Sequence, residues 1–200
     1  YYVSPLILQA TTFAVGANSN SAAAGDFNGD MKSDLAITNN ITGNVSLHLG
    51  NGMGEFAAAS NFPVGRDSNS VAVGDFNRDM KPDLAVANQG GNVGVLLGNG
   101  MGGFAAVANF PAGVIPYSVA AGDFNGDMKP DLTVANAGST NVSVMLGDGM
   151  GGFAAASNFP VDTISYSVAV GDFNRDMKPD LAVANFDGAS VSVLLGNGMG

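Results

Sequence analysis

The stretch DFNGDMKSD at residues 26–34 returns as DFNRDMKPD at 75–83, as DFNGDMKPD at 123–131 and as DFNRDMKPD at 172–180. In each copy, oxygen-bearing side chains stand at positions 1, 3, 5 and 9; in the first copy these are Asp26, Asn28, Asp30 and Asp34. Carboxylates crowded in this way repel one another unless a cation lies among them. Ca²⁺, which takes about six to eight oxygen ligands at roughly 2.3–2.6 Å, is the natural candidate. Four copies in register make the signal specific.

The first aspartates of the four loops are spaced 49, 48 and 49 residues apart, so the chain is an internal repeat. In the second unit, short apolar runs flanked by glycine, asparagine and proline predict strands at 70–74, 83–88, 92–98 and 104–110. The first of these runs is rich in small residues in every unit, which suits a strand close to a central axis. We predict an all-β fold, a β-propeller of four-stranded blades with one repeat of about 49 residues per blade.

The ends of the chain bear on how such a propeller closes. Residues 6–16 align with 55–65, the fourth-strand region of the first unit, whereas the last unit stops before its own fourth strand. We expect the N-terminal strand of the same or a neighbouring chain to complete the last blade. The chain begins at Tyr1 rather than at a methionine, which suggests a processed protein or a fragment. The predicted organisation is one repeat domain over 1–200, with a closing strand at 1–16 and units at 17–65, 66–113, 114–162 and 163–200, the last one incomplete.

The net charge of −10 is concentrated in the loops. Twelve of the 17 acidic residues are loop aspartates, and without these aspartates the chain would have 5 acids against 7 bases. The sequence has no cluster of basic residues that could bind phosphates, so nucleic acid is not an expected partner. No apolar run reaches the roughly 18 residues of a membrane span. The chain has no cysteine, so metal-clamped loops rather than disulfides are expected to stabilise it.

With its surrounding strands, the loop resembles the FG-GAP repeats of integrin α-subunit propellers and the VCBS-type repeats of bacterial surface and secreted proteins. In the second unit the matching residues are Gly74 to Asn77, Asp79, Asp83 to Val86, Val95 to Gly100 and Phe104. The resemblance implies an extracellular or cell-surface protein with about four Ca²⁺ per chain, one in the loop between the first and second strands of each blade. The implied ligands are side-chain oxygens at positions 1, 3, 5 and 9 and the backbone carbonyl at position 7: Asp26, Asn28, Asp30, Lys32 and Asp34; Asp75, Asn77, Asp79, Lys81 and Asp83; Asp123, Asn125, Asp127, Lys129 and Asp131; Asp172, Asn174, Asp176, Lys178 and Asp180.

The chain departs from this family pattern at loop position 6, where glycine is usual. Methionine stands there in all four copies: Met31, Met80, Met128 and Met177. If the position requires a positive φ, methionine costs about 1 kcal/mol or more. An EF-hand is excluded because position 12 carries Ile or Val instead of a bidentate Glu, and because no flanking helices are predicted.

These features predict a calcium-stabilised extracellular β-propeller with a structural or adhesive role that self-assembles through its end strands into a homo-oligomer or a head-to-tail assembly. Two alternatives remain: an accessory domain of a larger secreted protein, and a glycan-binding propeller that uses the positions that vary between units. Cell-surface proteins are further candidate partners. Enzymatic activity is not expected, because every carboxylate pair recurs four times, whereas catalysis needs one asymmetric pocket. The variable positions lie at 39–44, 66–69, 89–92, 114–117, 137–141 and 186–190.

Overall fold

The structure is a computed structural model of the 200-residue chain, and it describes residues 12–200. Within these residues there is no helix, and the strands form four antiparallel sheets, each made by consecutive strands. The all-β prediction is confirmed. The first sheet contains β1 (Ser19–Gly25), β2 (Asp34–Asn39), β3 (Asn44–His48) and β4 (Ser60–Pro63); the second contains β5 (Ser68–Gly74), β6 (Asp83–Asn88), β7 (Asn92–Leu96) and β8 (Ala108–Pro111); the third contains β9 (Pro116–Gly122), β10 (Asp131–Asn136), β11 (Asn141–Met145) and β12 (Ser157–Pro160); the fourth contains β13 (Ser165–Gly171), β14 (Asp180–Asn185) and β15 (Ser190–Leu194).

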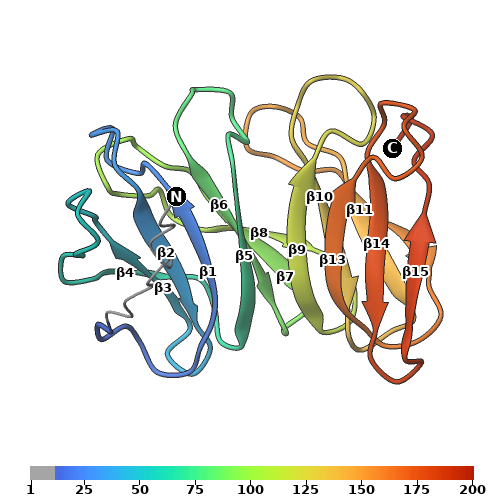
Figure 1. Cartoon of the computed structure of the whole chain (residues 1–200), viewed down its shortest axis with the longest axis horizontal. Helices are drawn as coiled ribbons and strands as arrows, with labels where there is room; N and C mark the ends of the chain where they lie inside the picture. The colour runs from blue at the N-terminus through green and yellow to red at the C-terminus, as the bar shows by residue number, and fades with distance from the viewer. Residues whose placement is uncertain (1–11) are drawn as a thin grey trace, which may run out of the picture.

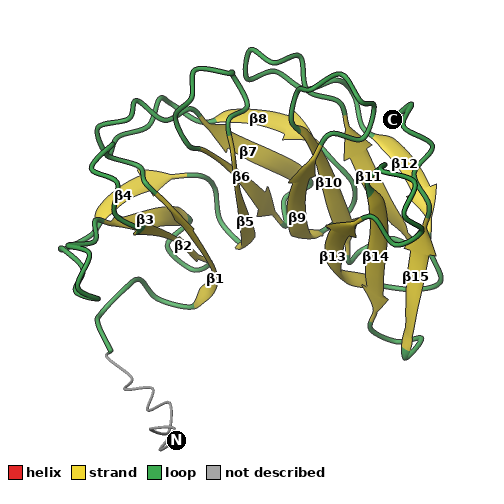
Figure 2. Cartoon of the chain, turned by 45° about the horizontal axis from the view of Figure 1, so that its top comes forward, coloured by secondary structure: helices red, strands yellow, loops and turns green. Residues whose placement is uncertain are grey.

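The four sheets stand side by side in an open arc, with their first strands on the inside (Figures 1 and 2). Each innermost strand contacts the innermost strand of the next sheet. One hydrogen bond recurs at these contacts: Ser21 Oγ accepts from the Val71 N–H at 3.3 Å, and Ser70 Oγ accepts from the Val119 N–H at 3.3 Å. The small residues of these strands allow this approach, as expected. The arrangement is that of neighbouring blades of a β-propeller.

The second sheet shows where sequence patterns determine strand bounds and where they do not. β6 has the predicted bounds, and all six of its residues are buried, because neighbouring sheets cover both of its faces. The fourth strand was predicted to begin at Phe104, but β8 spans Ala108–Pro111. Phe104 makes only an isolated bridge with Gly98, and its ring instead packs against the preceding sheet. A contact between units therefore displaces the start of this strand.

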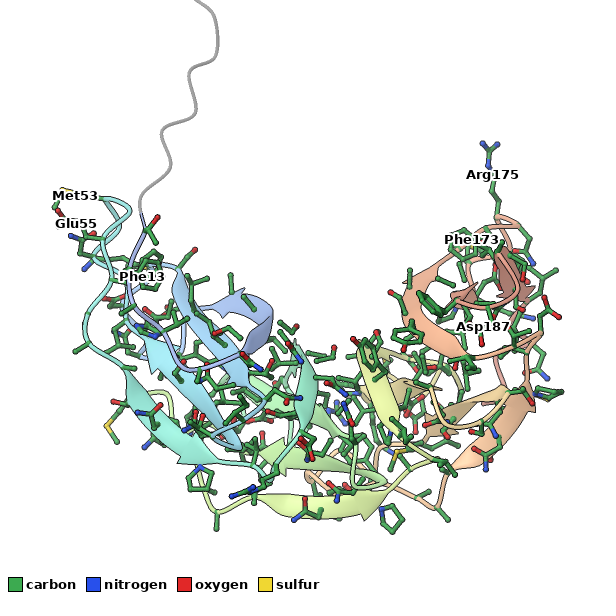
Figure 3. All side chains as sticks on the ribbon, turned by 90° about the horizontal axis from the view of Figure 1, so that it is seen from below. Phe13, Met53, Glu55, Phe173, Arg175 and Asp187 are labelled. Atoms are coloured by element: carbon green, nitrogen blue, oxygen red, sulfur yellow. The ribbon has the colours of Figure 1, made fainter. Side chains whose placement is uncertain are left out.

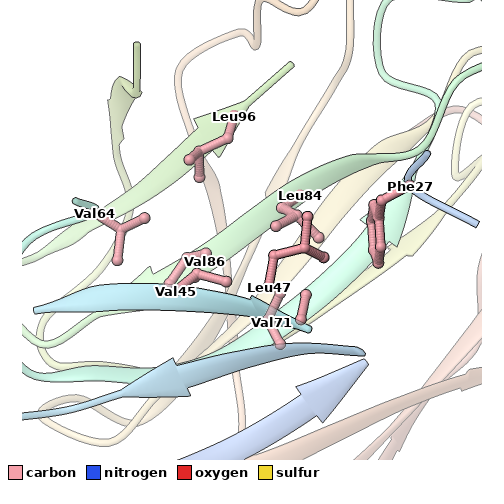
Figure 4. Close-up of a cluster of buried hydrophobic side chains, with 9 residues drawn as sticks. Phe27, Val45, Leu47, Val64, Val71, Leu84, Val86 and Leu96 are labelled. Carbon is pink, nitrogen blue, oxygen red and sulfur yellow. The ribbon is translucent and has the colours of Figure 1, made fainter. Parts of the chain in front are cut away.

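The apolar core lies between sheets rather than within one. The cluster between the first and second sheets joins Phe27, Val45, Leu47 and Val64 to side chains of the next unit, among them Val71, Leu84, Val86 and Leu96 (Figure 4). Two equivalent clusters lie between the later sheets. Full burial of such a side chain contributes about 1.5–3 kcal/mol. A single unit has no such partner for its faces, so each blade depends on its neighbours.

The predicted closing strand falls mainly on residues 1–11, outside the described part. Of the described residues of that segment, Phe13 lies against the first sheet, stacked on Phe56 with ring centroids 4.9 Å apart. In residues 12–200, no strand lies beside the outer edge of β15. Completion of the last blade by the N-terminal strand therefore stays a prediction. Among the described residues, no helix is long and apolar enough to cross a membrane.

Candidate metal-binding loops

The four acidic loops lie along one rim of the arc. Each connects the innermost strand of a sheet to its second strand, so the repeated topology places all four at the same edge (Figure 1). Ser and Pro at position 8 end the loop, and the aspartate at position 9 is the first residue of the second strand. The structure therefore places the predicted ligands of each loop in one compact turn, separate from those of the other loops.

Positions 1 and 3 converge on the backbone of position 5. The Asp30 N–H is shared by Asp26 Oδ1 and Asn28 Oδ1, each at 3.0 Å. Asp26 Oδ2 accepts from the Met31 N–H at 2.7 Å. The loop thus wraps its own amides around the first carboxylate and brings two side-chain oxygens side by side. The shared N–H recurs in the other loops, where the position-5 residues are Asp79, Asp127 and Asp176.

Position 5 is paired with the lysine at position 7. Lys32 Nζ lies 3.2 Å from Asp30 Oδ2, and the corresponding distances from Lys81 to Asp79 and from Lys129 to Asp127 are 3.0 Å. For Asp79, the hydrogen bond from the Lys81 side chain is the main cause of a pKa held below its ordinary value. Only the backbone carbonyl of the lysine was predicted to take part in the site, although a lysine at position 7 of every loop was the available signal for a charge partner.

Position 9 has a different environment from the other three. Asp34 is fully buried, and its two oxygens accept from the Phe27 N–H at 2.9 Å and from the Gly50 N–H at 2.8 Å. Asp83 accepts in the same way from Phe76 and Gly98, at 2.8 and 2.7 Å. This carboxylate therefore ties the start of the loop to the glycine that follows the third strand. The same bridge occurs at Asp131 and Asp180.

Burial opposes the charge of the position-9 aspartates in the middle sheets. Desolvation raises the pKa of Asp83, and the hydrogen bonds from Gly98 and Phe76 offset only part of that effect. The pKa of Asp131 is raised for the same reason. The glycine partner was not predicted, although Gly98 and its equivalents stand 15 or 16 residues after the aspartate in every unit. A Cβ at Gly98 would collide with the Pro82 carbonyl oxygen, so the close approach requires glycine.

Loop position 6 has a positive φ in every copy, and its methionine side chain is exposed. The φ values of Met31, Met80, Met128 and Met177 are 63°, 63°, 62° and 66°. The left-handed conformation costs an ordinary residue roughly 1–2 kcal/mol. Methionine therefore stands at a position that requires a positive φ, where the family usually has glycine. Each loop carries backbone strain at this position.

Met80→Gly is therefore expected to raise the free energy of unfolding by about 0.5–1 kcal/mol, since relief of strain exceeds the entropy that glycine adds to the unfolded chain. Met80 is 93% exposed, so little packing is lost. Met101→Gly is the matched control, because Met101 is also exposed but is not among the residues with positive φ. In urea unfolding, the midpoint should rise for Met80→Gly and fall for Met101→Gly. A lower midpoint for Met80→Gly would contradict the claim that position 6 is strained.

The side chains of a loop do not by themselves form a metal centre in this structure. Among residues 12–200, no three acidic, histidine or cysteine side chains converge closely enough to hold an ion. Asp34 is turned toward backbone amides, and Asp30 toward Lys32. The donor set nevertheless suits a hard divalent cation, because every candidate donor is an oxygen and those of Asp26 and Asn28 already lie side by side.

A second group of polar and aromatic side chains lies at the opposite rim, where the innermost strands begin. Asn69 Oδ1 accepts from Asn20, Asn40 and Gln89, at 3.1, 3.2 and 3.3 Å. In the later units, the ring centroids of Tyr117 and Tyr166 are 4.4 Å apart, and those of Tyr166 and Phe186 are 4.8 Å apart. Most of these residues lie at positions that vary between the four units. The fold thus brings these variable positions to one rim.

Four sheets, each from one repeat and each with an acidic loop after its innermost strand, define a β-propeller repeat protein. A family model described as "FG-GAP-like repeat" matches residues 26–86, 75–134 and 123–183. The chain belongs to this family, as its resemblance predicted. No curated protein sequence matches it.

Solved structures share the fold at low sequence identity. One is an Agrocybe aegerita lectin that recognises non-reducing terminal N-acetylglucosamine (17% identity, TM-score 0.57, 91% of this chain and 51% of that one). Another is BBS1N, solved in complex with ARL6DN (16%, 0.63, 90% and 58%). A third is the V. cholerae biofilm matrix protein Bap1 (17%, 0.57, 88% and 26%). The chain thus spans little more than half of the first two structures.

Proposed function

We propose that the chain is a calcium-stabilised extracellular β-propeller segment with a structural or adhesive role. The observation that carries this proposal is the fourfold repetition of one oxygen-rich loop on a single rim. Asp26 and Asn28, with their convergent oxygens, and Asp30 would hold the ion in the first loop, and the equivalent residues would hold it in the others. Bound Ca²⁺ supplies positive charge that removes repulsion among the loop carboxylates.

Within each loop, different residues have different roles. Asp34 fastens the loop to the end of the third strand through Gly50, independently of any ion. Lys32 offsets the charge of Asp30 at the exposed side of the turn. Four bound Ca²⁺ would change the net charge from −10 to about −2. Lower negative charge at this rim reduces repulsion between neighbouring loops and so favours close packing of the blades.

The strain at position 6 supports an extracellular location. Strained loops are expected to bind calcium with modest affinity, and extracellular modules work at dissociation constants of about 10⁻⁴–10⁻³ M. The regular repeat supports a scaffold or adhesive role, since the same loop and the same contact between sheets recur along the described residues. Comparison of thermal unfolding in Ca²⁺ and after chelation tests the proposal, and a large loss of stability on chelation is expected.

A second candidate function is glycan binding at the opposite rim, favoured by the aromatic group Tyr117, Tyr166 and Phe186 beside the amides around Asn69. Phe186 is 68% exposed, so the group offers an apolar face next to hydrogen-bonding side chains. The lectin of similar fold recognises N-acetylglucosamine.

Tyr166→Ala is expected to weaken binding to glycans that the wild type retains on an array by at least about tenfold, the equivalent of roughly 1.4 kcal/mol. Met53→Ala, on an exposed turn of the other rim, serves as the control and should bind as the wild type does. An array without hits for the wild type would exclude this second function and leave the calcium proposal intact.

A further inference from the structure

Most methionines of the chain lie at the acidic rim of the arc. Of the nine methionines, four occupy position 6 of the acidic loops and four follow the third strands: Met53, Met101, Met150 and Met199. The stretches after the third strands reach the same rim as the loops. A Cβ at Gly100 would lie 2.9 Å from Lys81 Cδ, and one at Gly149 would lie 2.9 Å from Lys129 Cδ. Two methionines of each unit therefore stand at one rim.

These methionine side chains are exposed even where a unit has neighbours on both sides. The second and third sheets each lie between two other sheets, and their rim residues Met80, Met101, Met128 and Met150 are 93%, 78%, 80% and 77% exposed. Met53, the equivalent of Met101, lies at the tip of its turn with its side chain directed away from the sheet (Figure 3). The exposure is therefore a property of the repeated turns, and the side chains are open to small solutes.

The fold does not depend on these side chains. The two turns of the second unit are held through backbone groups: the Met80 N–H donates to Asp75 Oδ2 at 2.9 Å, and the Met101 N–H donates to Asn99 Oδ1 at 2.8 Å. Position 6 carries a strain that glycine would remove, and so exposed a side chain offsets little of it by packing. A strained residue that the fold does not require points to a function of its side chain.

The composition of the rim favours sulfur chemistry over apolar docking. In residues 17–162, every large apolar side chain that is exposed at this rim belongs to a methionine, whereas Ile41, Val114 and Ile115 are exposed at the opposite rim. An apolar docking surface would be expected to expose leucine, isoleucine or phenylalanine as well, and without charged neighbours such as Asp79. A thioether differs from other apolar side chains because it is readily oxidised.

Met145 is the one methionine outside the rim, and it is fully buried in the core cluster between the second and third sheets. Oxidation of Met145 would bury a polar oxygen among apolar side chains, which destabilises a core. A sulfoxide at the rim projects into water and removes no contact of the core. The chain thus keeps nearly all of its oxidisable sulfur apart from the contacts that hold it together.

We propose that the rim methionines form a peroxide-reactive surface whose oxidation the fold tolerates. In each reaction a sulfur lone pair attacks one oxygen of hydrogen peroxide, and the S–O bond forms as the O–O bond breaks. Hydroxide leaves and takes the proton of the transferred oxygen, so the products are methionine sulfoxide and water. The sulfur loses two electrons and the peroxide gains them. Methionine sulfoxide reductases, with a thiol as reductant, reverse the change.

Treatment of the folded chain with hydrogen peroxide, followed by mass spectrometry of its peptides, tests the proposal. Met80, Met101, Met128 and Met150 are expected to react at the rate of a methionine in an unstructured peptide. Met145 should react at least about a hundredfold more slowly, because its exposure requires the core to open. The chain with oxidised rim methionines should keep its circular dichroism spectrum and its urea midpoint, and methionine sulfoxide reductases should restore its original mass.

Two variants assign the consumption of peroxide to the rim. Met101→Leu combined with Met150→Leu should lower the peroxide consumed by the folded chain by one molecule for each substitution. Met145→Leu, which nearly conserves the volume of the core side chain, should leave that consumption unchanged. Rim methionines as slow to react as Met145 would overturn the proposal, as would unfolding of the chain upon oxidation. Measurements in Ca²⁺ and in EDTA keep this outcome separate from that of calcium binding.

Discussion

Asp83→Ala is expected to lower the free energy of unfolding by about 2–5 kcal/mol, measured in EDTA so that no metal contributes. The substitution leaves the N–H groups of Phe76 and Gly98 without their acceptor in a fully buried site. Each buried donor left unpaired costs about 1–3 kcal/mol. Urea unfolding followed by circular dichroism measures the difference.

Two further variants separate the hydrogen bonds from charge and from general effects. Asp83→Asn keeps the shape and one acceptor, and burial already opposes the charge of Asp83, so a smaller loss of about 1–2 kcal/mol is expected. Asp187→Ala removes an exposed aspartate outside the loops and should change stability by less than about 0.5 kcal/mol. Equal effects of Asp83→Ala and Asp187→Ala would contradict the structural role of position 9.

Removal of calcium is expected to lower the unfolding temperature by more than about 10 °C. A ligand at 100 times its dissociation constant stabilises the folded state by about 2.7 kcal/mol per site. The proposed function places four such sites on one chain, and each kcal/mol shifts the unfolding temperature of a chain of this size by roughly 2–4 °C. Calorimetric scans in Ca²⁺ and in EDTA measure the shift.

Mg²⁺ provides the control for this effect. It requires near-octahedral geometry and gives up its water reluctantly, so it should stabilise the chain much less than Ca²⁺ does at the same concentration. Unfolding temperatures that agree in Ca²⁺, Mg²⁺ and EDTA would mean that the loops are held by their own hydrogen bonds, such as those around Asp26. The hydrogen bonds of Asp34 and its equivalents would then account for the conserved geometry of the four turns.

Local patterns predicted those parts of the fold that local sequence determines. β6 was predicted with its bounds because an apolar run between Asp83 and Asn88 fits a strand buried on both faces. For Met80, the glycine usual at that family position raised the question of a positive φ, and the structure has one. Repeat spacing predicted one sheet for each repeat, with an acidic loop between its first and second strands.

The features that were missed depend on contacts between distant segments. β8 begins later than predicted because Phe104 packs on Phe27 of the preceding unit. Asp34 was predicted only as a metal ligand, whereas its oxygens are bound to Phe27 and Gly50, a partner 16 residues away. The pattern of one unit contains no information about such partners until the sheets are placed together.

Isothermal titration of Ca²⁺ into the metal-free chain tests the central claim most directly. The account predicts saturable binding of about four ions per chain at dissociation constants near the extracellular range of about 10⁻⁴–10⁻³ M. Absence of any binding heat at millimolar Ca²⁺, together with an unchanged unfolding temperature, would contradict it.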